Sequence, residues 1–272
     1  MHTLAGALFA SAGGVLWKEM IGVLVGTSLV IASACVANNY MDRGIDARMK
    51  RTKKRPSVTG QIPFRNAMAY LVFLLAVGLV VLYLTTSLLV ISIGLIAYLL
   101  YVFVYGLAKR TTIHSTVIGA VPGALPAMAG YVAIDGQLSV GAWLIFLLVF
   151  TWQMPHFYAI SVFRRSEYKE AGLPVLGAVK PFATVKNYIM AYMLVYALTI
   201  ALLITSRTVS AAAGLLLLGG AAYWVSVYYN KKEGESKWAL AVFLASLVLT
   251  VLLVIAAVLN LFTADLPYGT MK

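Results

Sequence analysis

The stretch "MIGVLVGTSLVIASACVANNYMDRGIDARMKRTKKRP" (residues 20–56) passes from an apolar run into an acidic and then a basic segment. Residues 20–37 carry no charged side chain, and a helix of about 20 apolar residues crosses a bilayer core of roughly 30 Å. Cys35 is the only cysteine of the chain, so no intrachain disulfide can form, and we expect it to be a small buried side chain. The stretch therefore predicts a membrane-spanning helix with a charged end.

Similar apolar runs recur along the whole chain. We predict helices over residues 20–41, 65–84, 88–107, 115–133, 140–163, 187–205, 209–229 and 237–260, and a shorter one over 4–16. The chain is 62% hydrophobic and only 11% charged, whereas soluble domains are about 25% charged. We expect an all-α polytopic membrane protein, a bundle of nine transmembrane helices in a single domain over residues 1–272.

The segment 4–16 is the shortest of the predicted spans. At about 1.5 Å per residue it falls roughly 10 Å short of a normal hydrocarbon core. We expect this 272-residue form to be less stable and less active than a form extended upstream by roughly ten residues.

Basic residues are distributed unequally between the connections. The connections at 42–65, 108–114, 164–186 and 230–237 hold 18 of the 21 Lys and Arg residues, and the others are Lys18, Arg207 and Lys272. Lys and Arg gather on the cytoplasmic side of membrane proteins, so we expect a plasma-membrane protein with these connections in the cytoplasm. The net charge of +12 is then explained by topology and anionic lipid, and indicates no nucleic-acid partner.

Asn38, Asp42 and Asp46 are spaced four residues apart. On a helix this spacing places them on one face, here at the charged end of the predicted span 20–41. Carboxylates at membrane depth are expensive and mark functional sites. Mg²⁺ takes one or two protein carboxylates and completes its shell with water and phosphate oxygens. We predict a catalytic Mg²⁺ site here; the alternative is that the aspartates only cap the helix and balance local charge.

A run of basic residues follows the aspartates. It offers cations for phosphate oxygens, and guanidinium groups suit this role because they bind phosphate in a bidentate manner. From this run we assign Arg43, Lys50, Lys53 and Arg55 to diphosphate binding. Taken together, the acidic face and the basic run predict a metal–diphosphate site.

The pattern Asn-x-x-x-Asp-x-x-x-Asp followed by Arg-Pro at 55–56 resembles the first aspartate-rich motif of the UbiA-type intramembrane prenyltransferases. The resemblance extends over nearly the whole chain. It implies a cavity open to the cytoplasmic side, in which Mg²⁺ binds an isoprenoid diphosphate. The diphosphate would ionise to an allylic cation that is joined to an acceptor.

Three further stretches resemble the haem O synthase branch of that family. They are "WQMPHFYAISVFRRSEYKEAGLPVL" (residues 152–176), "YGLAKRTTIHSTVIGAVPGALPAMAGYVA" (105–133) and "RTKKRPSVTGQI" (51–62). The resemblance implies farnesyl diphosphate and haem B as substrates, and haem A synthase or a haem-copper terminal oxidase as partner. Two alternatives stay open: a quinone precursor or other lipid as acceptor, and a non-enzymatic carrier of haem or metal.

The resemblance also implies an acceptor site and a second acidic site. His156 and Trp152 are expected to bind the haem or other acceptor, because a neutral imidazole is a common haem ligand. The alternative for His156 is a hydrogen bond to a neighbouring helix. Glu167 and Tyr168 stand where the family has its second acidic motif, with Glu in place of Asp.

Three more cations are assigned to the diphosphate. They are Lys109, Arg110 and Arg164. Lys109 and Arg110 could instead face a haem propionate, or belong to an ordinary basic connection.

Prolines and glycines inside the spans give a further expectation. Pro122, Pro126 and Pro155 should interrupt their helices and so line a cavity. Glycines at 119, 123 and 130 fit close packing of helices.

Overall fold

The computed structural model of the protein describes residues 1–12, 14–230 and 234–264, and within these ranges every regular element is a helix. Eight helices are long and apolar enough to cross a membrane. They are Trp17–Met41 (α2), Phe64–Thr85 (α5), Leu88–Thr111 (α6, η1 and α7), Ser115–Asp135 (α8), Val140–Phe163 (α9), Phe182–Thr205 (α12), Ala211–Tyr229 (α13) and Glu235–Thr263 (α14). Each of the eight full-length predicted spans thus corresponds to one of these helices.

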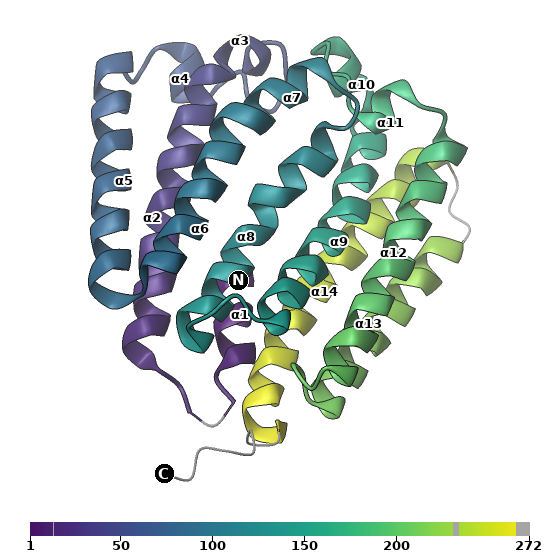
Figure 1. The fold of residues 1–272 in the computed structure, drawn as a ribbon. Coiled ribbons are helices and arrows are strands. Elements are labelled where there is room, and N and C mark those ends of the chain that lie inside the picture. The colour runs from purple at the N-terminus through teal and green to yellow at the C-terminus, as the bar shows by residue number, and fades with distance from the viewer. Residues whose placement is uncertain (13, 231–233, 265–272) are drawn as a thin grey trace.

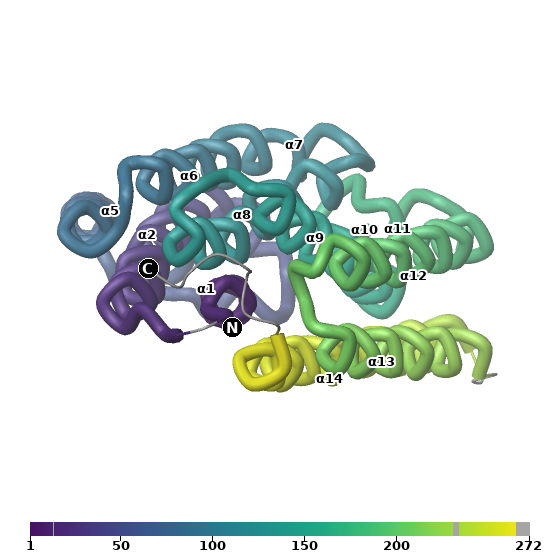
Figure 2. Tube along the Cα trace, turned by 60° about the horizontal axis from the view of Figure 1, so that its bottom comes forward, coloured from purple at the N-terminus to yellow at the C-terminus, as the bar shows by residue number. Residues whose placement is uncertain are grey.

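The long helices stand side by side in one bundle (Figure 1). Along the chain, α2 packs against α5, α8 against α9, and α9 against both α12 and α14. The short helix α1 (His2–Ala10) lies among the long ones, in contact with α8 and α14 (Figure 2). The ninth predicted segment is therefore a short helix packed inside the bundle, and among the described residues it does not belong to the helices long enough to cross a membrane.

The predicted extent of this first helix, residues 4–16, is wrong. The helix has nine residues and ends at Ala10. The Ser11 hydroxyl then donates to the Ala7 carbonyl over 2.8 Å, and Gly14 adopts a φ of +156°. The helix thus ends although the composition stays apolar, and glycine adopts the positive φ that follows without strain.

Close backbone contact holds α1 against α8. A Cβ added to Gly130 would lie 2.0 Å from the Thr3 carbonyl oxygen, and one added to Gly6 would lie 2.0 Å from that of Ala127. Only glycine fits at such distances, which confirms the packing role expected for Gly130. At the other two predicted glycines the neighbours are side chains, Tyr105 beside residue 119 and Gln153 beside residue 123.

The prediction that prolines interrupt their spans is also wrong. Helix α8 continues through Pro122 and Pro126, and α9 continues through Pro155. A proline removes one backbone donor, but neighbouring helices can keep the segment helical inside a membrane bundle. The irregular segment lies elsewhere, in the π-helix η1 (Leu100–Tyr105), which separates α6 (Leu88–Leu99) from α7 (Gly106–Thr111).

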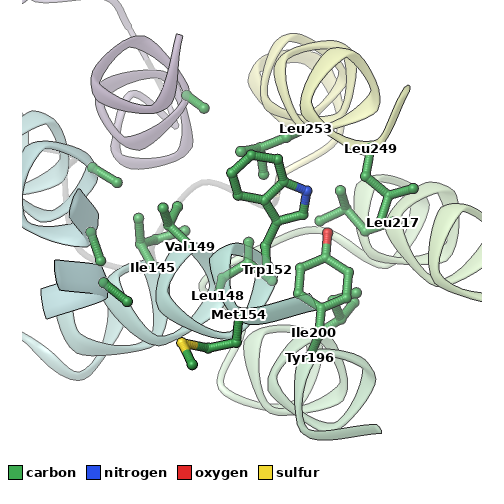
Figure 3. Close-up of a cluster of buried hydrophobic side chains, with 14 of the residues drawn as sticks. Ile145, Leu148, Val149, Trp152, Met154, Tyr196, Ile200, Leu217, Leu249 and Leu253 are labelled. Carbon is green, nitrogen blue, oxygen red and sulfur yellow. The ribbon is translucent and has the colours of Figure 1, made fainter. Parts of the chain in front are cut away.

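An apolar core joins the second half of the bundle (Figure 3). It is formed by Ile145, Leu148, Val149, Trp152 and Met154 of α9, Tyr196 and Ile200 of α12, Leu217 of α13, and Leu249 and Leu253 of α14. The Trp152 indole N–H donates to the Ser246 carbonyl over 3.0 Å. This core fixes α9, which carries both residues assigned to the acceptor, Trp152 and His156.

One end of the bundle carries short helices in the predicted basic connections (Figure 1). These are α3 (Arg43–Asp46), α4 (Pro56–Thr59), α10 (Arg165–Glu170) and α11 (Leu176–Val179). The end of α7 reaches the same place (Figure 1). The predicted basic connection 230–237 and Lys272 fall partly or wholly outside the described residues.

Candidate active site

Asn38, Asp42 and Asp46 keep one helical register although α2 ends at Met41. The amide N–H of Asp42 donates to the Asn38 carbonyl over 2.9 Å, and that of Asp46 donates to the Asp42 carbonyl over 2.8 Å. The spacing of four therefore continues through the junction with α3, and the three side chains share a face as predicted. Asp42 and Asp46 are only 8% and 5% exposed.

Cations from α7 neutralise Asp42. The Lys109 ammonium donates to Asp42 Oδ2 and also to Asn38 Oδ1. Arg110 donates to Asp42 Oδ1 over 3.1 Å. The bundle thus brings the end of the third span onto the acidic face of α2.

Asp46 has its own cation. Arg55 Nη1 donates to Asp46 Oδ2 over 2.7 Å and to Asn39 Oδ1 over 3.0 Å. Arg55 immediately precedes α4, whose first residue is Pro56, and this local structure aims the guanidinium back toward α2.

The seven cations assigned to the diphosphate are arranged in two ways. Arg55, Lys109, Arg110 and Arg164 each pair with a carboxylate. Arg43, Lys50 and Lys53 are exposed and take part in no ion pair within the described ranges. The paired group lies at the acidic residues, and the exposed group lies on the surrounding surface.

The second acidic site lies on α10. Glu167 accepts a hydrogen bond from Arg164 over 3.1 Å. Burial raises the pKa of the Tyr168 hydroxyl, while the charges of Arg51 and Arg164 act in the opposite direction. The Tyr168 hydroxyl is therefore protonated at neutral pH, and it can donate a hydrogen bond to a phosphate oxygen.

Two adjoining cavities lie inside the bundle. The first, of about 320 Å³, is lined by Lys109 and Tyr168 near the acidic site. The second, also about 320 Å³ and mostly apolar, lies between α1, α2, α6 and α8. Tyr101 and Gly123 line both, so the two cavities meet there. Cys35 is exposed and lines the apolar cavity, which contradicts its expected burial.

Several cavity residues were not singled out from the sequence. Gln153, Phe157 and Ser161 line the cavity next to Lys109. Their spacing of four residues, with polar groups inside an apolar span, is the signal that could have identified them. Tyr101 and Tyr105, whose rings stack at 5.5 Å, also line it, but tyrosines in spans are usually packing residues.

His156 and Trp152 lie on another face of α9. Their rings stack at 4.9 Å, and neither residue lines the two cavities described above. His156 Nδ1 lies 2.7 Å from the Ser246 hydroxyl. This geometry matches the alternative expected for His156, a hydrogen bond to a neighbouring helix.

The Ser246 hydroxyl contacts both His156 and the backbone of its own helix. The same hydroxyl contacts the Phe243 carbonyl, and in the arrangement where it donates there it accepts from His156 Nδ1–H. Nε2 then carries the lone pair. Among the described residues, Nε2 of His156 has no hydrogen-bond partner.

The donor set at the acidic face suits Mg²⁺ better than a softer metal. No cluster of three or more His, Cys, Asp or Glu side chains occurs in the part of the chain that the structure describes. Two carboxylates and an amide oxygen remain, from Asp42, Asp46 and Asn38. Mg²⁺ is usually bound by one or two carboxylates together with substrate phosphates.

Residues 1–248 match the UbiA prenyltransferase family. The chain belongs to this family. It is accordingly a transferase, and the eight apolar helices make it a multi-pass membrane protein. The UbiA resemblance expected from the Asn38–Asp46 motif is confirmed.

One curated relative of this UbiA protein is the "Protoheme IX farnesyltransferase" of Photorhabdus laumondii. It is 37% identical over 255 residues, which cover 91% of this chain and 85% of the relative. The resemblance to the haem O synthase branch is thereby confirmed.

Solved structures confirm the fold. The apo UbiA homologue from Aeropyrum pernix K1 superposes with a TM-score of 0.77 at 17% identity, covering 95% of each chain. A UbiA homologue from Archaeoglobus fulgidus, bound to GPP and Mg²⁺, gives a TM-score of 0.66 at 16% identity, covering 94% of each chain. The UbiA bundle is therefore shared along almost the whole length.

Proposed function

We propose that this protein transfers the farnesyl group of farnesyl diphosphate to a vinyl group of haem B, giving haem O and diphosphate. The observation that carries the proposal is the 37% identity with a protoheme IX farnesyltransferase over 91% of the chain. The cavity beside Lys109 and the acidic residues supports it from the geometry.

Asn38, Asp42 and Asp46 are the residues that would hold Mg²⁺. When bound, Mg²⁺ supplies positive charge to the diphosphate, which becomes a better leaving group. The Archaeoglobus relative bound to GPP and Mg²⁺ supports this assignment for the family.

The chain's own cations stabilise the departing diphosphate. The C–O bond to the farnesyl carbon breaks, and its electron pair leaves with the diphosphate oxygen. Lys109, Arg110 and Arg55 are already gathered at Asp42 and Asp46. Arg164 pairs with Glu167 at the second acidic site, and the Tyr168 hydroxyl lines the cavity beside Lys109 and can donate to the diphosphate. Preorganised charge of this kind is often the largest contribution to catalysis.

The cavities then determine which nucleophile reaches the allylic cation. The apolar cavity accommodates the isoprenoid chain, because its walls are mostly apolar. The vinyl group of haem B donates its electron pair to the farnesyl carbon, and water adds to the resulting cation as hydroxyl with loss of a proton. Excluding water until the C–C bond has formed prevents hydrolysis of the farnesyl cation.

His156 and Trp152 form the proposed acceptor site. In the tautomer that carries its proton on Nδ1, His156 would offer the Nε2 lone pair to the haem iron. Both residues lie on α9, where they directly precede the cavity residues Gln153 and Phe157 in the sequence.

The basic end of the bundle is proposed to face the cytoplasm, in the plasma membrane. The excess of Lys and Arg in its connections supports this orientation. We also infer that haem A synthase or a haem-copper terminal oxidase receives the product, since haem O has to be used by a haem protein.

One observation favours a second candidate acceptor. Because His156 does not line the described cavities, a quinone precursor or other lipid that enters the cavity itself is the alternative. Family membership argues against a non-enzymatic carrier. Purified protein given labelled farnesyl diphosphate, Mg²⁺, haem B and 4-hydroxybenzoate together should label only the haem. Labelling of the benzoate would overturn the haem assignment.

A further inference from the structure

The acidic site carries more positive than negative charge. Asp42 and Asp46 face Lys109, Arg110 and Arg55, so two carboxylates meet three cations. Adding Mg²⁺ alone would raise the net formal charge from one to three. Like charges at such short range repel strongly where burial limits screening.

Lys109 lies between the acidic residues and the cavity. It lines the cavity, whereas Asn38, Asp42 and Asp46 do not. The side chains of Lys109 and Asp42 are only 10% and 11% exposed. A diphosphate in the cavity therefore meets Lys109 before it can reach the carboxylates.

The ammonium of Lys109 also uses the oxygens that a metal would need. It bonds to Asp42 Oδ2 and Asn38 Oδ1 at once. These two atoms belong to the residues proposed to hold Mg²⁺. Lys109 and the metal therefore compete for the same ligands.

We propose that Lys109 is the internal counter-ion of the metal site and makes Mg²⁺ and diphosphate bind together. Asp42 and Asn38 exchange Lys109 for Mg²⁺ only when a diphosphate is present to accept the released ammonium. Without the diphosphate, the displaced lysine would be left buried and unpaired, which is costly. The proposal rests on the metal–diphosphate part of the proposed function, but not on haem as acceptor.

Calorimetric titration of the full-length protein in detergent with Mg²⁺ tests this exchange. The titration is run with and without farnesyl S-thiolodiphosphate, an analogue that ionises slowly. Wild-type protein should bind Mg²⁺ at least ~10-fold more tightly with the analogue, and the analogue should bind more tightly with Mg²⁺ by the same factor.

Lys109→Met removes the competing charge but keeps an unbranched chain. This variant should bind Mg²⁺ alone about tenfold or more tightly than wild type, and the analogue should improve Mg²⁺ binding much less. Lys180→Met is the matched control, because it removes one exposed lysine at the same end of the bundle and should leave both affinities unchanged.

Mg²⁺ alone binding no more tightly to Lys109→Met than to wild type would overturn the proposal. If that variant does not fold, equal Mg²⁺ affinity of wild type with and without the analogue would overturn it too. Haem is absent from every titration. A protein that shows the exchange but makes no haem O would contradict the acceptor assignment and leave the role of Lys109 intact.

Discussion

Two cations share the carboxylate of Asp42, and this determines what a substitution there does. Asp42→Asn removes the charge that would hold Mg²⁺, so haem O formation should fall by at least ~10³-fold. The variant also weakens the pairing of Lys109 and Arg110, at a cost of about 1–3 kcal/mol in stability.

Product formation per mole of folded protein is measured for this variant, together with its thermal unfolding in detergent. Lys54→Gln changes an exposed basic residue of the same connection and serves as the control. Near-normal turnover of Asp42→Asn would mean that Asp42 binds no metal.

Ser246 holds the His156 ring by a single hydrogen bond. Ser246→Ala should free Nδ1, allow the other tautomer and weaken haem binding by about three- to tenfold. Farnesyl diphosphate binding should not change, because its proposed site lies at Lys109 and the cavity.

Haem titration followed by Soret absorbance gives the readout for Ser246→Ala and for His156→Ala. His156→Ala should alter the Soret band as well as the affinity. An unchanged band in His156→Ala would mean that the imidazole does not ligate the iron, and equal weakening of both substrates would indicate a packing role.

At the residue scale, sequence reasoning succeeded where neighbours are close along the chain. The shared face of Asn38, Asp42 and Asp46 follows from local helix geometry, which the backbone bonds preserve. The pairing of Asn38 with Lys109 spans 71 positions, and that of His156 with Ser246 spans 90. Such contacts depend on how the helices pack. From its charge alone, Lys109 was assigned to the diphosphate, and its contact with the Asp42 carboxylate was not predicted.

At the scale of elements, the contact between α1 and α8 depends on two glycines. Gly130→Val would place a Cβ 2.0 Å from the Thr3 carbonyl oxygen and force the helices apart. Overpacking of this kind costs about 1–3 kcal/mol or more. We expect a lower unfolding temperature for purified Gly130→Val.

Gly219→Ala in α13 is the matched control for that substitution. Nothing lies within 4 Å of a Cβ built there, so the change should be neutral or slightly stabilising. Equal unfolding temperatures for Gly130→Val and wild type would contradict the close contact of α1 with α8.

Helix positions were predictable because uninterrupted apolar runs determine which segments cross a bilayer. The ends of the helices and the irregular segments within them were harder to predict from the sequence. The first helix ends at Ala10 although the apolar composition continues, and Pro122 was expected to break a helix that neighbouring helices keep intact. The π-helix at Leu100–Tyr105 leaves no signal in composition.

At the scale of the whole molecule, the apolar cavity should set the length of the isoprenoid. Ala34 is 5% exposed and lines this cavity. Ala34→Leu fills part of it, and a few methylene groups are worth about tenfold or more in discrimination. The ratio of kcat/KM for farnesyl diphosphate to that for geranyl diphosphate should therefore fall by about tenfold.

Ala222→Leu provides the matched control, since Ala222 is exposed on α13 and lines neither cavity. It should leave the ratio unchanged. A ratio in Ala34→Leu that equals the wild-type ratio would place the isoprenoid chain somewhere other than this cavity.

Cavities were the least predictable feature of the molecule. Their walls come from α1, α2, α6, η1, α7, α8, α9, α10 and the connection after α10, which meet only after folding. The sequence indicated that a cavity was needed, through the family resemblance, but not that Tyr101 and Gly123 join two compartments.

Mass analysis of the haem after incubating purified protein with haem B, farnesyl diphosphate and Mg²⁺ in H₂¹⁸O tests the proposed reaction most directly. The predicted product is haem carrying one farnesyl group and one ¹⁸O-labelled hydroxyl, formed only when Mg²⁺ is present and absent with Asp42→Asn. Haem B recovered unchanged, while the protein still cleaves farnesyl diphosphate or prenylates another acceptor, would contradict it.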